Sequence, residues 1–170
     1  MSAFITNDLA EATPSPSVAP KKYLGEVGDV RDNSRFDEAK LDAWLRGALA
    51  NYRGPLSVKQ FDGGQSNPTY LLQTPARKYV LRRKPPGVLL KSAHAVDREF
   101  RVLSALGAQG FPVPEPLVLC EDESVIGTMF YVMSHVDGRI FWDCSMPDLA
   151  RSERAAIFDT VNETLARLHR

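Results

Sequence analysis

The sequence has few cysteines, no net charge and no long apolar run, and each of these absences excludes a class of protein. Its two cysteines, Cys120 and Cys144, cannot build a framework of several disulfides and do not stand at the spacing of metal ligands. Lysine plus arginine (21) equals aspartate plus glutamate (21), so net charge does not favour nucleic acid or an anionic membrane as a partner. No apolar run reaches the roughly 18 residues that a transmembrane helix needs. We therefore expect a cytoplasmic protein with reduced cysteines, no membrane partner and no nucleic-acid partner.

The composition indicates one globular domain with a tail. Hydrophobic residues make up 44% and charged residues 25% of the 170 residues, which is an ordinary balance for a folded domain. Residues 1–33 show neither helical nor strand periodicity, and their segment TPSPSVAP is rich in proline and serine. We expect residues 1–33 to be a disordered tail and 34–136 to form the folded lobe. We expect 137–170 to leave that lobe and to begin a second one.

Beyond the tail, the apolar pattern predicts a helix, three strands, a second helix, two strands and a third helix. The predicted helices are 36–49, 92–106 and 149–169, and the predicted strands are 56–61, 69–73, 77–84, 117–120 and 129–133. The fold class that follows is α+β: an antiparallel five-stranded sheet with one helix inserted after the third strand, preceded by one helix and followed by another. This order is typical of the small lobe of a kinase-like fold.

The first predicted hairpin carries a candidate phosphate loop in the segment FDGGQSNPTYLL, residues 61–72. A phosphate needs backbone N–H groups at close range, and Gly63 and Gly64 leave the backbone accessible. Ser66 and Asn67 add side-chain donors. Gly-Gly and Ser-Asn-Pro are also common in ordinary turns, and this segment taken alone favours that alternative.

The third predicted strand, with KYVLRRK at residues 78–84, strengthens the case for phosphate binding. Strand alternation places Val80 and Arg82 on one face and Leu81 on the other. In a kinase-like lobe, Val80 would contact the adenine ring and Arg82 would contact the phosphates. The alternative is a solvated basic edge strand, whose cationic side chains prevent aggregation.

The second predicted helix offers an acidic partner for Arg82. A half-buried guanidinium needs a carboxylate, and Glu99 flanks the apolar stripe of this helix. Glu99 would hold the guanidinium toward the phosphate. Asp97 is the competing partner, but it lies about 160° to 200° away around the helix, so we expect it to be solvated. Without the strand, Glu99 would be taken for an ordinary surface charge.

The last predicted strand runs into the segment SHVDG, residues 134–138, which we interpret as the hinge between two lobes. We expect the Ser134 carbonyl and the Val136 N–H to bond the adenine edge. Met133 would pack at the back of the same site. A plain buried strand is the alternative, and the apolar residues alone do not exclude it.

The hinge segment also contains His135-Val136-Asp137, which matches the H-x-D signature of a kinase catalytic loop. We reject that interpretation because a metal-binding Asn should follow about five residues later, whereas position 142 is Trp. No metal-binding acid of the Asp-Phe-Gly type follows either. We therefore assign no catalytic residue and no metal ligand in this chain, and we expect His94 and His169 to lie on helix surfaces.

Five segments together resemble the aminoglycoside phosphotransferase and choline kinase superfamily, nearest to the branch fused to acyl-CoA dehydrogenases. They occur in the family's order: FDEAKLDAWL, QFDGGQSNPTYLL, KYVLRRKPPG, AHAVDREFRVL and GTMFYVMSHVDGRIF. The resemblance covers residues 36–170. It implies a nucleotide-phosphate loop at residues 63–67 and an adenine-contacting hinge at residues 134–136. It also implies that Arg82 takes the place of the phosphate lysine, with Glu99 as its partner.

The resemblance implies an activity as well as a site. Members of this superfamily use ATP, with magnesium, to phosphorylate a hydroxyl group of a small molecule. Their H-G-D…N catalytic loop and metal-binding acid follow the helix that LARLHR, residues 165–170, resembles, and neither motif occurs in this sequence. We therefore expect the chain to bind ATP as the nucleotide-binding portion of such an enzyme and to be inactive alone. The hydroxyl substrate would bind only together with the second lobe.

Two other functions stay open at this point. The first is a non-enzymatic nucleotide-binding or interaction module, which a stable folded monomer would favour. A lone small lobe should instead leave the apolar stripe of the last helix partly uncovered and self-associate through it. That stripe consists of Phe158, Val161, Leu165 and Leu168. The second is a nucleic-acid module that uses the basic segment 77–91, which fits poorly with a neutral net charge.

Overall fold

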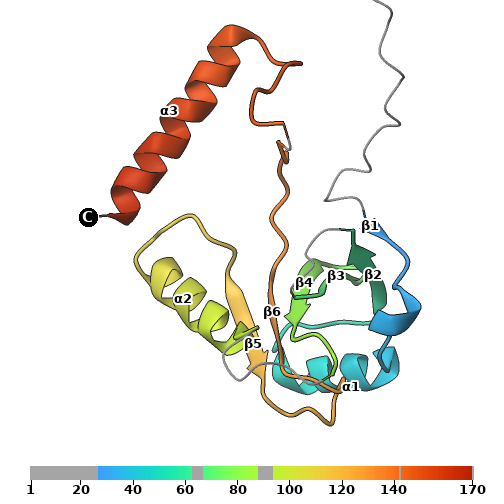
Figure 1. Cartoon of the computed structure of the whole chain (residues 1–170). Helices are drawn as coiled ribbons and strands as arrows, with labels where there is room; N and C mark the ends of the chain where they lie inside the picture. Colours follow the sequence, from blue (N-terminus) through green and yellow to red (C-terminus); the bar gives the residue numbers. More distant parts are fainter. Residues whose placement is uncertain (1–26, 63–66, 88–93, 142, 170) are drawn as a thin grey trace, which may run out of the picture.

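In the residues that the structure describes, a six-stranded antiparallel sheet forms the body of the protein (Figure 1). The computed structural model describes residues 27–62, 67–87, 94–141 and 143–169. The strands are β1 Val27–Gly28, β2 Ser57–Phe61, β3 Thr69–Gln73, β4 Lys78–Arg83, β5 Pro116–Cys120 and β6 Phe130–Ser134. The helices are α1 Glu38–Ala48, α2 Val96–Ala108 and α3 Arg151–Leu168, with a 3-10 turn at Asp32–Ser34. The strand order is β1-β2-β3-β4-β6-β5.

The predicted α+β class is confirmed, whereas the predicted number of five strands is wrong. Residues 27–28 add strand β1, in which Val27 pairs with Phe61 and Gly28 pairs with Gln60. This stretch falls within the predicted tail because a strand of two residues is too short to show an alternating pattern. Pairing with β2 makes it a strand. Of the tail predicted for residues 1–33, residues 1–26 lie outside the described residues.

Helix α1 covers one face of the sheet, which we call the α1 face, and closes the hydrophobic core there. The helix begins after Asp37, whose Oδ1 accepts a hydrogen bond from the Lys40 N–H at 2.9 Å. Leu41 and Leu45, one turn apart on the helix, are buried in the same core as Leu72 of β3. Burying each leucine contributes roughly 1.5–3 kcal/mol, so the periodicity that predicts this helix also anchors it to the sheet.

The α1 face also contains a buried cation, Arg83, which is 2% exposed. Its Nη1 donates to the Ile126 carbonyl at 3.2 Å, and its Nη2 donates to the Ser34 carbonyl at 3.1 Å. The guanidinium lies 5.2 Å from the ring centroid of Phe36 and 5.5 Å from that of Tyr70. Arg83 therefore ties the segment before α1 and the β5–β6 loop to β4.

Helix α2 lies against β5 and β6 on the opposite face of the sheet, which we call the α2 face. In the register of β4 and β6, Arg82 pairs with Tyr131 and Arg83 with Phe130, so neighbouring residues point to opposite faces. Phe100 of α2 meets Tyr131 edge-on, with ring centroids 6.0 Å apart and an interplanar angle of 63°. Helix α2 therefore lies on the same face as Arg82, for which a role in ligand binding is predicted.

Helix α3 stands apart from the sheet (Figure 1) and buries no residue of its own. Its last turn contacts the segment after α2, where Arg167 Nη2 donates to the Gly110 carbonyl at 3.4 Å. The predicted apolar stripe is uncovered, with exposed fractions of 50% for Phe158, 48% for Val161, 49% for Leu165 and 46% for Leu168. Within the described ranges, the helices are all too short or too polar to cross a membrane.

Candidate nucleotide site on the α2 face

The α2 face carries an apolar row that crosses three strands. Leu71 of β3 pairs with Val80 of β4, and Val80 pairs with Met133 of β6. Directly paired residues of antiparallel strands point to the same face, so the three side chains are neighbours. Leu71 and Val80 are buried and Met133 is half-buried. Such a row of apolar side chains is of the kind against which an aromatic ring can pack.

An ion pair between Arg82 and Glu99 lies next to this row. The Arg82 Nε is 2.8 Å from the Glu99 Oε2, and both side chains are about one-third exposed, at 34% and 35%. The contact is an ion pair without the geometry of a directed hydrogen bond. The predicted pairing of these two residues is confirmed. A partly exposed pair contributes about 0–1 kcal/mol to stability, so its main effect is on the orientation of the two groups.

Two further side chains hold the Glu99 carboxylate. Asn67 Nδ2 donates to Oε1 at 2.9 Å, and the Tyr131 hydroxyl donates to Oε2 at 3.2 Å. Burial raises the pKa of the Tyr131 phenol, and the neighbouring carboxylate raises it further, so the phenol stays protonated and can donate. Tyr131 is not among the residues predicted for the site. The signal was present, because Tyr131 is two residues before Met133 on the same strand and therefore points to the same face.

Asn67 links Glu99 to His94, and His94 lies in a place that differs from the predicted one. Asn67 is buried, and its amide lies between Glu99 and His94. On the His94 side, His94 Nδ1 is 2.9 Å from Asn67 Oδ1. The prediction of His94 as a helix-surface residue is wrong: the residue precedes α2, is half-buried and faces the site. The helical pattern of α2 does not reveal this, because the contact joins segments 27 residues apart.

The structure says less about the predicted phosphate loop and the predicted hinge. Gly63, Gly64 and Ser66 lie outside the described residues, so their role stays a prediction. Ser134 ends β6, where its N–H donates to the Glu115 carbonyl at 2.8 Å and its Oγ accepts the Glu115 N–H at 2.9 Å. Val136 follows as an exposed residue. The adenine contacts predicted for Ser134 and Val136 stay predictions as well.

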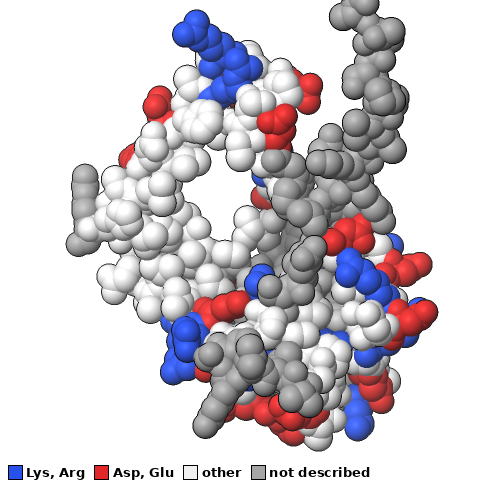
Figure 2. All heavy atoms as spheres, in the orientation of Figure 1, with Lys and Arg blue, Asp and Glu red and all other residues white. Residues whose placement is uncertain are grey.

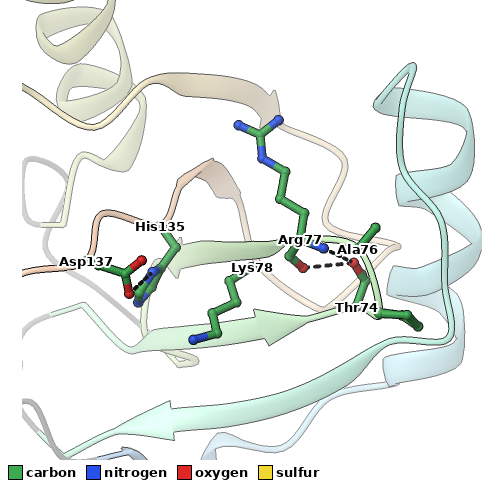
Figure 3. A pocket seen from close by; sticks show the side chains of 7 residues that line it. Thr74, Ala76, Arg77, Lys78, His135 and Asp137 are labelled. Carbon is green, nitrogen blue, oxygen red and sulfur yellow. Dashed lines mark hydrogen bonds and ion pairs between the residues drawn. The ribbon is translucent and has the colours of Figure 1, made fainter.

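A hollow of about 370 Å³ lies at the end of the sheet where the predicted hinge leaves it, here called the hinge end (Figure 3). It is lined by Thr74, Pro75, Ala76, Arg77, Lys78, His135 and Asp137. His135 and Asp137 point toward each other, with His135 Nδ1 3.5 Å from Asp137 Oδ1, whereas the Arg77 side chain extends away from them. Lys78 and Arg82 are four residues apart on β4, roughly 13 Å, so Asp137 belongs to the hinge end and not to the Arg82–Glu99 pair.

The described residues give little support for a metal or a nucleic-acid site. Nowhere in these ranges do three His, Cys, Asp or Glu side chains come close enough together to hold a metal ion. On the face seen in Figure 2, basic and acidic side chains are interspersed and do not gather into one basic patch.

The sheet order and the helix inserted after β4 are those of a kinase-like fold. The chain belongs to the phosphotransferase enzyme family, whose model matches residues 57–170. A solved structure from Ralstonia eutropha, assigned to the aminoglycoside phosphotransferases, is 48% identical in sequence with a TM-score of 0.66. That match covers 78% of this chain and 37% of the solved chain. The predicted kinase-like fold is confirmed.

Curated relatives confirm the predicted branch of the family. Acyl-CoA dehydrogenase family member 11 from Gallus gallus is 52% identical over 147 residues, and family member 10 from Mus musculus is 48% identical over 141 residues. These matches cover 84% and 82% of this chain but only 19% and 13% of the two relatives. The chain therefore spans less than a fifth of the length of the relatives to which it is similar.

Proposed function

We propose that this chain supplies the nucleotide-binding part of an ATP-dependent phosphotransferase that acts on a hydroxyl group of a small molecule. Membership of the phosphotransferase enzyme family supports the reaction class. The observation that carries the nucleotide site is the position of Arg82, held by Glu99, beside the row of Leu71, Val80 and Met133. A nucleotide needs these two features next to each other, an apolar surface for its base and a cation for its phosphates.

The residues of the α2 face fit ATP by their chemistry. Val80 and Arg82 point to the same face and are two residues apart on β4, roughly 7 Å, so a base on Val80 leaves the phosphates near Arg82. The Arg82 side chain is 34% exposed and its Nε lies against Glu99, which leaves the N–H donors of its two Nη groups for phosphate oxygens. Bound ATP would supply the phosphoryl group, and the residues of this chain would bind and orient it.

The remaining predicted contacts complete the proposed site at its two ends. The backbone N–H groups of Gly63 and Gly64, together with Ser66, would surround the phosphates. The Ser134 carbonyl and the Val136 N–H would bond the adenine edge. Both sets flank the apolar row in the order that a nucleotide requires, because β3 follows the proposed phosphate loop and β6 precedes the proposed hinge.

We further propose that phosphoryl transfer requires residues outside these 170. The chain covers 37% of the solved phosphotransferase chain that it matches, so more than half of that chain has no counterpart in the match. Asp137 is exposed and paired with His135 at the hinge end, which does not support a catalytic role. Free Cys120 and Cys144 fit a reducing compartment, so the proposed location is the cytoplasm.

Titration calorimetry of ATP into the 170-residue chain, with and without magnesium, tests this proposal. We expect weak binding that does not depend on magnesium and that Arg82→Ala weakens by roughly tenfold, as loss of a charge-assisted contact of about 1.4 kcal/mol would. Asp137→Ala is the control and should bind like the wild type. Failure of the wild-type chain to bind ATP would contradict the proposed function, and equal effects of the two substitutions would contradict the hinge assignment.

The uncovered stripe on α3 favours a second function, association with another protein surface. Four large apolar side chains of this helix are each about half exposed, and contiguous apolar surface of this kind marks an interaction site. We propose self-association through this stripe. Sedimentation velocity should show a dimer or larger species that Val161→Lys abolishes, whereas Asn162→Lys, on a neighbouring exposed position, should not. A wild-type chain that stays monomeric up to high concentration would rule this out.

A further inference from the structure

Three elements of the fold meet at the carboxylate of Glu99. Its Oε2 lies 2.8 Å from Arg82 Nε on β4 and accepts the Tyr131 hydroxyl of β6 at 3.2 Å. Its Oε1 accepts Asn67 Nδ2 at 2.9 Å from the segment just before β3. A carboxylate is planar, so a bond that holds Oε1 also sets the direction in which Oε2 faces Arg82. Asn67 therefore helps to determine the geometry of the ion pair without touching Arg82.

The chemistry of these partners settles the orientation of the Asn67 amide. An ionised carboxylate only accepts hydrogen bonds, so the amide NH2 must face Glu99 and the amide oxygen must face His94. His94 Nδ1 lies 2.9 Å from that oxygen. This contact is a hydrogen bond only if Nδ1 carries a proton, which defines the tautomer of a neutral ring. One hydrogen-bonded chain thus runs from His94 through Asn67 to Glu99 and its partner Arg82.

The backbone at His94 supports a specific role for its ring. The residue has φ +61°, in the left-handed region that glycine and asparagine adopt more readily than histidine. Its carbonyl accepts the Val96 N–H at 2.9 Å at the start of α2, where Ala95 provides no side-chain cap. The turn into α2 thus places the imidazole against Asn67, and helix capping does not account for a histidine at this position.

We propose that His94 is a positioning residue: through Asn67 it holds the Glu99 carboxylate and thereby directs the Arg82 guanidinium toward the phosphates of the nucleotide. Asn67 then serves as the link in this chain, with one N–H of its amide bonded to Glu99. The consequence for binding rests on the proposed nucleotide function. The orientation of Arg82 does not, and it can be measured without a nucleotide.

Two substitutions separate the ring from the backbone conformation. His94→Gly accepts a positive φ without strain and removes the ring. His94→Asn also tolerates a positive φ and places an amide NH2 where the imidazole Nδ1–H stands, so it keeps the donor to Asn67. If the ring acts through this hydrogen bond, the asparagine variant should behave like the wild type and the glycine variant should not. A role in shaping the turn alone would leave both variants like the wild type.

The first measurement is NMR of the 170-residue chain without nucleotide. The Arg82 Nε–H resonance of the wild type reports the ion pair, and its position in Glu99→Gln marks the broken pair. We expect His94→Gly to shift this resonance most of the way toward that of Glu99→Gln, and His94→Asn to restore it. The imidazole nitrogen shifts of wild-type His94 should show the Nδ1–H tautomer, which needs no variant at all.

The second measurement compares ATP with adenosine by titration calorimetry. His94→Gly should weaken ATP binding about three- to tenfold, the range expected for the loss of one hydrogen bond that orients a charged group. Adenosine binding should not change, because adenosine lacks the phosphates that Arg82 contacts. His94→Asn should bind both ligands like the wild type. Weaker binding of both ligands to His94→Gly would indicate general disruption and contradict a positioning role.

The outcomes distinguish this inference from the proposed function on which it rests. An unmoved Arg82 resonance in His94→Gly, or an Nε2–H tautomer of neutral His94 in the wild type, overturns the inference. A shifted resonance that His94→Asn fails to restore also overturns it, because the effect would then not pass through the hydrogen bond. A shifted and restored resonance in a chain that binds no ATP supports the positioning of Arg82 and contradicts only the nucleotide-binding function.

Discussion

Arg82 and Arg83 are neighbours in the sequence and lie in two very different environments. Arg83 points to the α1 face, where it is 2% exposed and donates to two backbone carbonyls. Arg82 points to the α2 face, where it is 34% exposed and pairs with the Glu99 carboxylate. The alternation of a strand thus gives two identical side chains different roles. The buried cation joins elements of the fold, and the accessible cation is available to a ligand.

The largest expected effect is on the α1 face. Arg83→Ala should lower the free energy of unfolding by roughly 3 kcal/mol, because it leaves the Ile126 carbonyl without its donor and removes packing against two aromatic rings. Arg82→Ala should lower it by less than about 1 kcal/mol, as expected for a partly exposed ion pair. Urea denaturation of the two variants measures both values. Similar losses for both would show that the two faces do not differ as described.

A second prediction concerns a carboxylate that fastens α1 to the segment after it. The hydrogen bond from the Tyr52 hydroxyl, together with Arg46, holds the pKa of Asp42 below its ordinary value of 3.8. Asp42→Asn should therefore lower the free energy of unfolding by about 1 kcal/mol at pH 7. Because the folded pKa is depressed, this stabilisation is fully present above the ordinary pKa and is lost as the pH falls through the depressed value.

The pH dependence provides the check on Asp42. The difference in unfolding free energy between the wild type and Asp42→Asn should stay constant from pH 7 to about pH 5 and should shrink below about pH 4. Chemical denaturation at several pH values measures it. A difference that grows on acidification would mean that Asp42 is not stabilised as a carboxylate in the folded protein.

The third prediction returns to the α2 face and carries a smaller effect. Tyr131→Phe removes the hydroxyl that donates to Glu99 but keeps the ring that meets Phe100. We expect a loss of about 0.5–1 kcal/mol in the free energy of unfolding and a two- to threefold weaker affinity for ATP. Phe100→Leu is the matched variant, since it alters the ring contact and leaves the hydroxyl in place. If Tyr131→Phe binds ATP as tightly as the wild type, Asn67 and Arg82 alone suffice to hold Glu99.

The smallest effect is expected at the hinge end. Asp137→Ala should change the free energy of unfolding by less than about 0.5 kcal/mol, because the carboxylate is exposed and its contact with His135 is long, at 3.5 Å. Thermal unfolding of the variant measures this. A marked loss of stability would mean that the hollow beside the hinge is a structural part of the lobe.

Much of the candidate site follows from local patterns in the sequence. The side chains of Val80 and Arg82 share a face because a strand has a period of two residues. Glu99 reaches Arg82 because it flanks the apolar stripe of α2. Such inferences succeed because the residue period of a strand or helix is a local property of the sequence. It does not depend on where in the fold the element packs.

The contacts that were not predicted all join segments that are distant along the chain. Asn67 reaches Glu99 across 32 residues, and Arg83 reaches Ser34 across 49 residues. No local pattern in the sequence marks either contact. A polar residue before a strand, or a basic residue within a strand, looks the same in the sequence whether it makes such a contact or is solvated. Strand β1 was missed for a related reason, since its two residues gain their conformation only from pairing with β2.

The sequence by itself determined the order of the three helices and of strands β2 to β6, the faces of these elements, and the family to which the chain belongs. These follow from periodicity and from motifs, which need no knowledge of what lies nearby in space. Only the tertiary structure decided that His94 and Asn67 complete the surroundings of Glu99, and that Arg83 is buried while Arg82 faces outward. The physical reason is that burial and hydrogen bonding depend on which surfaces meet, and that is settled only when the sheet and its two helices pack together.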